Sequence, residues 1–178
     1  MTKNFQEPFH VELWLFQVKH VTPAYLEWMH NPAVTQYLES RWRTYSLEDL
    51  ISYVRHVNES PRDFLFGIFV EGYGHVGNIK IGEIDWKHRY GDMGLIIGDS
   101  SVWGKGVGTR GINLACDYAF QELGLRKIVA GIYEPNVGSR RAFEKAGFVL
   151  AGRLAQHRLC QGKYVDQLIM ERLASHEQ

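Results

Sequence analysis

The sequence predicts an α/β fold of the α+β kind, in which helices cover both faces of a mixed, mostly antiparallel sheet of about seven strands. Segments with strand and helix patterns follow one another in the order β-αα-βββ-α-β-α-ββ. Short turns rich in glycine join consecutive strands, and such turns are typical of antiparallel hairpins. No linker, internal repeat or low-complexity segment interrupts the chain, so we expect residues 1–178 to form a single domain.

The N-terminal third is predicted to hold one strand, two helices and a short helical turn. The strand spans residues 11–18, and the helical segments span about 22–29, 33–38 and 46–58. Thr22 precedes Pro23, and an N-cap residue followed by proline begins many helices. The first helix should end before Asn31-Pro32, because a residue that precedes proline avoids the helical conformation. Ser46 and Asp49 have the spacing of a capping box.

Strand and helix patterns continue to the end of the chain. The expected strands span 64–71, 76–86, 92–98, 127–133, 148–159 and 164–173, and the expected helices span 107–123 and 137–146. Residues 72–74 and 88–91 are rich in turn formers and predict hairpin connections. Arg110, Asn113 and Asp117 recur every three or four residues, so the helix has one polar stripe and a broad apolar face that should pack on the sheet.

The composition excludes several classes of function. Lys and Arg together number 20, as do Asp and Glu, so the formal net charge is zero. This balance argues against a nucleic-acid or anionic-membrane partner bound through bulk charge. Neither a membrane-spanning segment nor a signal peptide is expected, which favours a cytoplasmic location. The two cysteines make no disulfide framework and the eight histidines show no ligand spacing, so no metal is expected.

The segment from Val102 to Thr109, VWGKGVGT, has the most specific pattern in the chain. Three glycines alternate at the start of a predicted helix, and without Cβ atoms their backbone N–H groups can turn toward one point. The helix N-terminus adds free N–H groups and a partial positive charge. The segment therefore predicts a phosphate cradle, most simply for the pyrophosphate of a nucleotide cofactor. A plain turn before the helix is the alternative.

Two common phosphate-binding motifs do not fit this segment. Gly106 to Gly111 matches G-x-G-x-x-G, but residues 99–105 separate its first glycine from the preceding strand. Glu134, the only acidic candidate for the ribose, lies too far downstream. A P-loop fails as well, because Lys105 is followed by glycine rather than by Ser or Thr.

Two motifs together resemble the GNAT superfamily of N-acetyltransferases. The family's cofactor loop reads Arg/Gln-x-x-Gly-x-Gly/Ala, and here Trp103, Gly106 and Gly108 occupy those positions. Trp-Gly-Lys-Gly is the form common in the subgroup that resembles the RimJ/RimL ribosomal-protein acetyltransferases. Downstream, NVGSRRAFEKAGF at 136–148 is similar to the family segment Asn-x-x-Ser-x-x-x-Tyr-Glu-Lys-x-Gly-Phe. The resemblance covers nearly the whole chain, from residue 28 to residue 166.

The resemblance implies an acetyl-CoA-dependent enzyme whose fourth and fifth strands splay apart. The pantetheine arm of acetyl-CoA would enter that gap, and a backbone N–H there would polarise the thioester carbonyl. The residues expected to bind acetyl-CoA are Leu95, Ile96, Ile97, Trp103, Gly104, Lys105, Gly106, Val107, Gly108, Thr109, Asn136, Ser139 and Phe143. Asn136 is also well placed to cap the next helix with Ser139, and Lys105 is as readily a solvated loop lysine.

Acetyl transfer to an amine requires removal of a proton from the amine and release of the thiolate. Asp92 begins the strand beside the cofactor and is the preferred base, with Glu83 and Asp85 as alternatives. Alternation places Glu83 and Asp85 on one face of their strand. The family's general-acid tyrosine is replaced by Phe143, so either Tyr133 donates the proton or the thiolate leaves unaided.

The N-terminal helices and the final hairpin should select the acceptor. Trp28, Asn31, Glu39 and Arg41 suit a hydroxylated or charged amine, although Trp28 and Asn31 also suit packing and helix termination. We expect a small-molecule primary amine that attacks the thioester directly, with an amino-sugar nucleotide slightly favoured. A protein N-terminal acetyltransferase and a non-catalytic acyl-CoA-binding module are the alternatives. The sequence leaves the oligomeric state open, and a homodimer is compatible with it.

Overall fold

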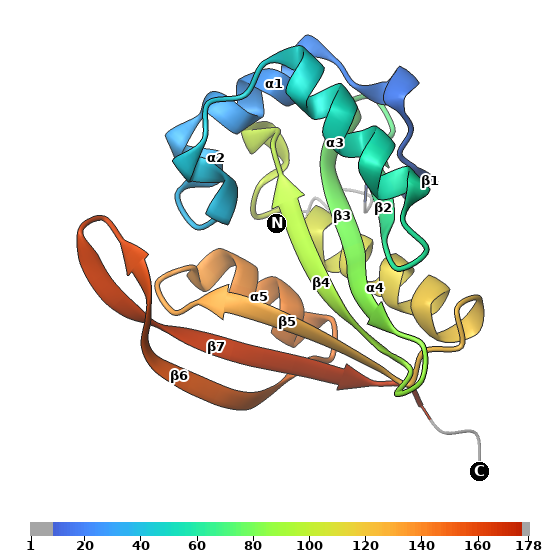
Figure 1. Ribbon diagram of the computed structural model, residues 1–178, viewed down its shortest axis with the longest axis vertical. Coiled ribbons are helices and arrows are strands. Elements are labelled where there is room, and N and C mark those ends of the chain that lie inside the picture. Colours follow the sequence, from blue (N-terminus) through green and yellow to red (C-terminus); the bar gives the residue numbers. More distant parts are fainter. Residues whose placement is uncertain (1–8, 176–178) are drawn as a thin grey trace, which may run out of the picture.

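Figure 1 shows the computed structural model of the chain, which describes residues 9–175. The strands are β1 (Val11–Leu15), β2 (Phe64–Val70), β3 (Gly74–Asp85), β4 (Tyr90–Ile97), β5 (Lys127–Tyr133), β6 (Val149–Cys160) and β7 (Lys163–Leu173). They form one sheet in the order β1-β2-β3-β4-β5-β7-β6. Neighbouring strands are antiparallel except β4 and β5, which are parallel. The predicted mixed, mostly antiparallel sheet is confirmed.

Helices cover both faces of this sheet, as predicted. They are α1 (Pro23–His30), α2 (Pro32–Thr35), α3 (Leu47–Glu59), α4 (Val107–Gln121) and α5 (Val137–Lys145), with the 3-10 helices η1 (Val18–His20), η2 (Glu39–Trp42) and η3 (Ser100–Val102). Successive residues of β2 belong to different cores: Leu65 packs with Phe16 and Val54 on the α1–α3 side, whereas Phe66 packs with Ile112 on the α4 side. Within residues 9–175, no helix is both long and apolar enough to cross a membrane.

Local sequence signals define several helix ends. The Thr22 side chain accepts a hydrogen bond from the backbone N–H of Tyr25 at 3.3 Å, and Ser46 begins α3 with the predicted capping box. The strand predicted at residues 11–18 is too long, because β1 ends at Leu15. There the chain bends into η1, where the Gln17 backbone N–H donates to Nδ1 of His20 at 3.0 Å and closes a tight turn.

The feature of the fold that positions the site is the divergence of β4 from β5. The two strands pair only through the first residues of each, from Tyr90 with Lys127 to Asp92 with Val129. Beyond this point β5 follows β7, and the two halves of the sheet open apart (Figure 1). Residues 93–97 of β4 therefore keep β3 on one side and have no strand of the described chain on the other. The splay expected from the family resemblance is confirmed.

Candidate active site

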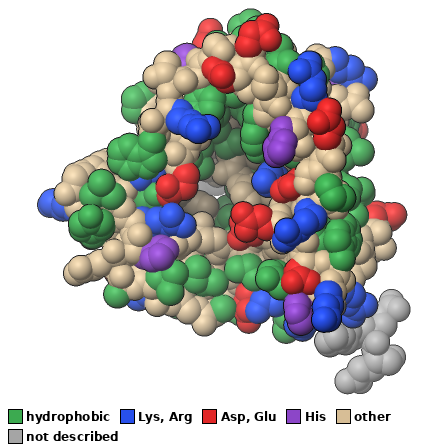
Figure 2. Space-filling view, viewed as in Figure 1, with side chains coloured by type: hydrophobic (Ala, Val, Ile, Leu, Met, Phe, Trp, Pro, Cys, Tyr) green, Lys and Arg blue, Asp and Glu red, His purple; other side chains and the backbone are tan. Residues whose placement is uncertain are grey.

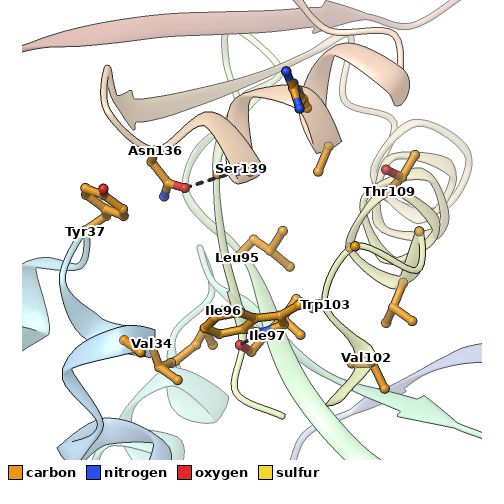
Figure 3. Close-up of a pocket in the computed structure, with 18 of the residues that line it drawn as sticks. Val34, Tyr37, Leu95, Ile96, Ile97, Val102, Trp103, Thr109, Asn136 and Ser139 are labelled. Atoms are coloured by element: carbon orange, nitrogen blue, oxygen red, sulfur yellow. Dashed lines mark hydrogen bonds between the residues drawn. The ribbon is translucent and has the colours of Figure 1, made fainter. Parts of the chain in front are cut away.

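A cavity of about 530 Å³ opens where β4 and β5 diverge (Figure 3). It is enclosed by the end of β4, the glycine-rich loop, the first turn of α4, α5 and the segment around α2. The predicted cofactor-binding residues that line it are Leu95, Ile96, Ile97, Trp103, Gly104, Gly106, Val107, Gly108, Thr109, Asn136 and Ser139. Segments far apart in the sequence thus meet in one cavity, which we call the donor cavity.

The glycine-rich loop presents a helix N-terminus to the donor cavity. Gly104 and Gly106 have φ angles of 72° and 83°, values that side chains with a Cβ rarely adopt. Gly106 is the N-cap of α4, and its carbonyl accepts the first helical hydrogen bond, from the backbone N–H of Arg110 at 3.1 Å. Within the described part of the chain, no side chain caps this helix. The N–H groups of its first turn are therefore available to an anion such as a pyrophosphate.

Trp103 fixes the loop to the end of β4. Its indole Nε1 donates a hydrogen bond to the carbonyl oxygen of Ile97 at 2.9 Å, and the ring lies along the cavity beside Ile96 and Ile97 (Figure 3). In the resemblance, this position holds Arg or Gln. Tryptophan offers one donor and no positive charge, so the side chain at this position adds no cation to the anion-binding loop.

Asn136 and Ser139 occupy the opposite wall of the donor cavity. The Asn136 side-chain oxygen accepts a hydrogen bond from the backbone N–H of Ser139 at 3.2 Å, so Asn136 caps α5 as the sequence suggested (Figure 3). A cap uses only the oxygen of the amide, and the nitrogen remains a donor. Structural capping and a contact with the cofactor are therefore compatible at this residue.

Two predicted cofactor residues lie away from the donor cavity. The ammonium nitrogen of Lys105 is 5.5 Å from the ring centroid of Phe9 and 6.0 Å from that of Tyr73. Phe143 is buried in the core and packs edge-to-face on Phe148, with ring centroids 4.9 Å apart. A part for either side chain in cofactor binding stays a prediction.

The sequence interpretation missed other residues of the donor cavity. The missed residues are Ala33, Val34, Gln36, Tyr37, Leu38, Val102, Gly138, Arg141, Ala142 and Lys145. Arg141 and Lys145 are four residues apart on α5, so helical periodicity would have placed them on the face that Asn136 begins. The residues from 33 to 38 reach the cavity only through the tertiary fold, for which no local signal exists.

A second cavity of about 390 Å³ lies on the α1 and α3 side of β3 and β4. Its floor consists of cross-strand pairs, namely Asn78 with Ile96, Lys80 with Gly94 and Gly82 with Asp92. Its walls include Tyr25, Met29, Glu39, Ser40, Tyr45, Leu50, Tyr53 and Glu83. Leu38, Leu95 and Ile96 line both cavities, so the two spaces meet at β4. We call the second space the acceptor cavity.

Asp92 lies on the floor of the acceptor cavity. Its side chain is open to the cavity, but the surrounding protein reduces its solvation, and this burial together with the nearby charge of Glu83 raises the pKa of Asp92 to about 6. Lys80 opposes the shift. That opposition is limited, because the Lys80 ammonium is paired with Asp63 at 2.9 Å. The carboxyl of Asp92 therefore titrates close to neutrality, as a general base requires.

The predicted alternation of Glu83 and Asp85 is wrong. The register of β3 against β4 shifts between Gly82 and Asp85, and Glu83 adopts a φ of 51°. This bulge turns Glu83 to the acceptor cavity, where it lies near Asp92. The Asp85 side chain instead accepts a hydrogen bond from the backbone N–H of His88 at 2.7 Å and stabilises the turn.

Tyr133, Glu39 and Arg41 form a network that ties η2 to β5. The Tyr133 hydroxyl donates to a Glu39 carboxylate oxygen and accepts from Nη1 of Arg41 at 3.0 Å. Arg158 of β6 forms an ion pair with Glu39 at 3.2 Å. Burial, followed by the hydrogen bond to Glu39, raises the pKa of Tyr133. Glu39 lines the acceptor cavity. Arg41 instead donates hydrogen bonds to Tyr133 and to the backbone carbonyl oxygens of Leu38 and Leu159.

Trp28 packs against the end of β4, and Asn31 caps a helix. The Trp28 ring lies against Gly98, where an added Cβ would come within 1.9 Å of the indole, and its centroid is 4.9 Å from that of His75. Asn31 caps α2 by accepting a hydrogen bond from the backbone N–H of Ala33 at 3.0 Å. Neither residue lines the donor or the acceptor cavity. Their contact with an acceptor stays a prediction.

Figure 2 shows this side of the molecule hollowed where the two halves of the sheet diverge, with both acidic and basic side chains around the hollow. Among residues 9–175, no group of three or more His, Cys, Asp and Glu side chains is arranged to hold a metal ion. The geometry thus combines an anion-binding helix end, an open strand edge and a carboxyl group with a raised pKa.

This combination is that of an acetyltransferase, and residues 11–149 match the family model described as "Acetyltransferase (GNAT) domain". The chain belongs to this family. The expected family, fold and acetyl-CoA dependence are therefore confirmed at the level of the family.

Named N-acetyltransferases are among the proteins to which the chain is similar. The chain is 33% identical over 114 residues to the probable N-acetyltransferase YjcK of Bacillus subtilis, covering 63% of this chain and 62% of that protein. It is 30% identical over 145 residues to the spermidine N(1)-acetyltransferase of Escherichia coli K12, covering 79% and 74%. The fold matches a crystal structure of spermidine N-acetyltransferase from Vibrio cholerae in complex with CoA and spermine, with a TM-score of 0.82, 24% identity and coverage of 93% and 96%.

Proposed function

We propose that this protein transfers an acetyl group from acetyl-CoA to a primary amine of a small, positively charged molecule by direct attack on the thioester. The observation that carries the proposal is the meeting of the two cavities at β4. One cavity has an uncapped helix N-terminus, and the other has carboxylates. The donor cavity therefore suits the pyrophosphate of acetyl-CoA, and the acceptor cavity suits a positively charged amine.

Backbone groups hold the acetyl donor in this proposal. N–H groups at the start of α4 bind the pyrophosphate, and the free edge of β4 from Met93 to Ile97 pairs with the amides of pantetheine. Asn136 adds its amide nitrogen from α5. When bound, acetyl-CoA supplies an activated acetyl thioester at the junction of the two cavities.

Asp92 acts as the general base in the proposed reaction. It faces the acceptor cavity, and its pKa of about 6 makes it a stronger base than an ordinary carboxylate while still leaving it mostly ionised at neutral pH. It accepts the amine proton directly or through one water molecule. Glu83 is the alternative base, because it lines the same cavity and lies near Asp92.

The acceptor class follows from the charges around the acceptor cavity. Glu39, Glu83 and Asp92 line it together with Lys80; Glu39 is paired with Arg158 and Lys80 with Asp63, which leaves Glu83 and Asp92 facing the cavity. Carboxylates attract a protonated amine and oppose the pyrophosphate of an amino-sugar nucleotide. The names of the spermidine acetyltransferases among the relatives agree with this reading. We therefore infer a polyamine-like acceptor in preference to an amino-sugar nucleotide or a RimJ/RimL-type protein N-terminus.

An acceptor screen that follows thiol release tests this proposal. Spermidine and shorter diamines should give the highest kcat/KM, and Asp92→Asn should reduce that value with each of them. Higher efficiency with an amino-sugar nucleotide or a basic peptide would overturn the acceptor class. Binding of acetyl-CoA without turnover of any amine would establish the non-catalytic acyl-CoA-binding module instead.

We also infer that the chain self-associates through β6. This strand lies at the edge of the sheet, and Val149, Leu150 and Tyr164 of the β6–β7 hairpin are 62%, 54% and 69% exposed. An apolar edge strand is a common site of pairing with a second copy. Light scattering should give at least a dimer mass, and Val149→Lys should lower it; a monomer mass for the unmodified protein would contradict the inference.

A further inference from the structure

The proposed reaction leaves open which group protonates the departing sulfur. Phe143 stands where the resemblance expects a tyrosine, and it is 2% exposed, buried in the core and without a hydroxyl. The Tyr133 hydroxyl already donates its proton to Glu39 and accepts from Arg41. Its raised pKa also makes it a weaker acid. Neither aromatic residue is thus suited to the task.

Tyr37 is the phenol that faces the donor cavity. It lies in the segment between α2 and η2, and its ring projects beside Asn136 at the end of the cavity away from Thr109 (Figure 3). The next residue, Leu38, lines both cavities. Tyr37 thus lies in the donor cavity, one residue from the junction where the thioester must meet the amine.

The other hydroxyl-bearing side chains of the donor cavity are less suitable. Thr109 belongs to the first turn of α4, which is the pyrophosphate end of the cavity. Ser139 belongs to the first turn of α5, next to the Asn136 cap. Both carry alkyl hydroxyls, which are much weaker acids than a phenol. Among the described residues that line the donor cavity, Tyr37 alone carries a phenol, and it is next in sequence to Leu38 at the junction.

We propose that Tyr37 is the general acid of the reaction, an assignment that rests on the proposed function. The amine nitrogen bonds to the acetyl carbon, the carbon–sulfur bond breaks, and its electron pair stays on sulfur. The Tyr37 hydroxyl gives its proton to that sulfur and regains one from solvent, while Asp92 passes to solvent the two protons that the ammonium group loses, one before the attack and one as the amide forms. The acid thus faces the donor cavity and the base the acceptor cavity, on the two sides of β4.

Tyr37→Phe and Tyr133→Phe form a matched pair that tests this assignment. Tyr37→Phe should lower kcat about 100-fold, the lower end of general acid catalysis, because a thiolate is already a fair leaving group. The KM values for acetyl-CoA and the amine should stay within about twofold, since the acid acts in the transition state. Tyr133→Phe should reduce kcat less. An unchanged kcat in Tyr37→Phe, or a larger loss in Tyr133→Phe, would overturn the assignment.

Calorimetric binding supplies a readout that does not depend on turnover. If the Tyr37 hydroxyl contacts sulfur, Tyr37→Phe weakens CoA several-fold and leaves desulfo-CoA, which lacks the sulfur, unaffected. Equal weakening of both ligands, or of neither, would reject the contact. If the unmodified protein acetylates no amine, the proposed function fails. The comparison of CoA with desulfo-CoA still decides whether Tyr37 contacts the sulfur.

Discussion

Asp92 is the residue whose environment most directly determines how the proposed enzyme depends on pH. Its pKa is raised to about 6, first by burial and then by Glu83. A base is active only when deprotonated, so kcat/KM should fall about tenfold per pH unit below pH 6 and level off above it. A profile from pH 4.5 to 8.5 checks this. A flat profile would exclude Asp92 as the base.

Glu83→Gln separates the two causes of this shift. Removing the neighbouring negative charge should lower the pKa of Asp92 and move the acidic limb of the profile to lower pH. The plateau should persist if Asp92 is the base. If the limb disappears with Glu83→Gln and remains with Asp92→Asn, Glu83 is the base instead.

Asp92 also affects stability, and the sign follows from proton linkage. Because its pKa is higher in the folded chain, the folded state binds more protons between about pH 4 and pH 6. The favourable contribution is present below pH 4 and is lost as the pH rises through 6. Asp92→Asn should therefore raise Tm relative to the unmodified protein at pH 7.5, and this gain should shrink at pH 4. An equal difference at both pH values would contradict the raised pKa.

For single residues, the sequence predicted which strand carries an acidic side chain better than it predicted the direction in which that side chain points. Asp92 was singled out because it begins the strand beside the expected cofactor, and the structure places it on the floor of the acceptor cavity. Glu83 was also singled out, but its predicted orientation was wrong. No pattern in the sequence predicts a bulge in which a glutamate has a positive φ. Tyr37 was missed because only the tertiary fold brings the segment after α2 to the cavity that α5 also lines.

At the scale of elements, the start of α4 is the part of the donor cavity that the backbone itself builds. Gly106→Ala forces an alanine into a φ of 83°, which costs about 1–2 kcal/mol. An added Cβ would meet nothing within 4 Å, so the cost is backbone strain and not a clash. Relief of the strain would disorder the N–H cradle, and acetyl-CoA affinity should fall by about tenfold. Urea unfolding and calorimetry measure the two effects.

Gly108→Ala is the matched control for this change. Its added Cβ would lie 3.6 Å from Leu95 and 3.8 Å from Ala142, which are ordinary contacts. Gly108 lies inside α4, so alanine should leave stability unchanged or raise it slightly, and any loss of affinity would come from the Cβ that it adds to the donor cavity. If Gly106→Ala and Gly108→Ala weaken acetyl-CoA binding equally, the glycines are needed because they lack a side chain, and the left-handed backbone at Gly106 is not what binding requires.

Element boundaries were predictable where a side chain or a glycine determines them. Thr22, Ser46 and Asn136 each cap the helix that the sequence assigned to them. The end of β1 was not predictable, because residues 16–18 are as apolar as a strand requires and the bend at η1 depends on the His20 side chain. The splay of β4 from β5 follows from no local pattern and came only from the family resemblance.

At the scale of the whole molecule, the donor and acceptor cavities lie on the two sides of one strand. Leu38, Leu95 and Ile96 line both, so bound donor and acceptor would touch at β4 without an intermediate carrier. The two cysteines, Cys116 and Cys160, are buried, and neither lines a cavity. This arrangement favours a ternary complex over an acetylated enzyme.

A bisubstrate conjugate tests that arrangement, because it needs both cavities at once. Spermidine joined to the sulfur of CoA through an acetyl linker should bind at least about 100-fold more tightly than CoA, since the second contact becomes intramolecular. A conjugate that carries the linker but no amine is the control and should bind like CoA. Asp92→Asn should weaken the spermidine conjugate selectively. Equal affinity of conjugate and control would mean that the two cavities are not occupied together, and the direct-attack mechanism would then fail.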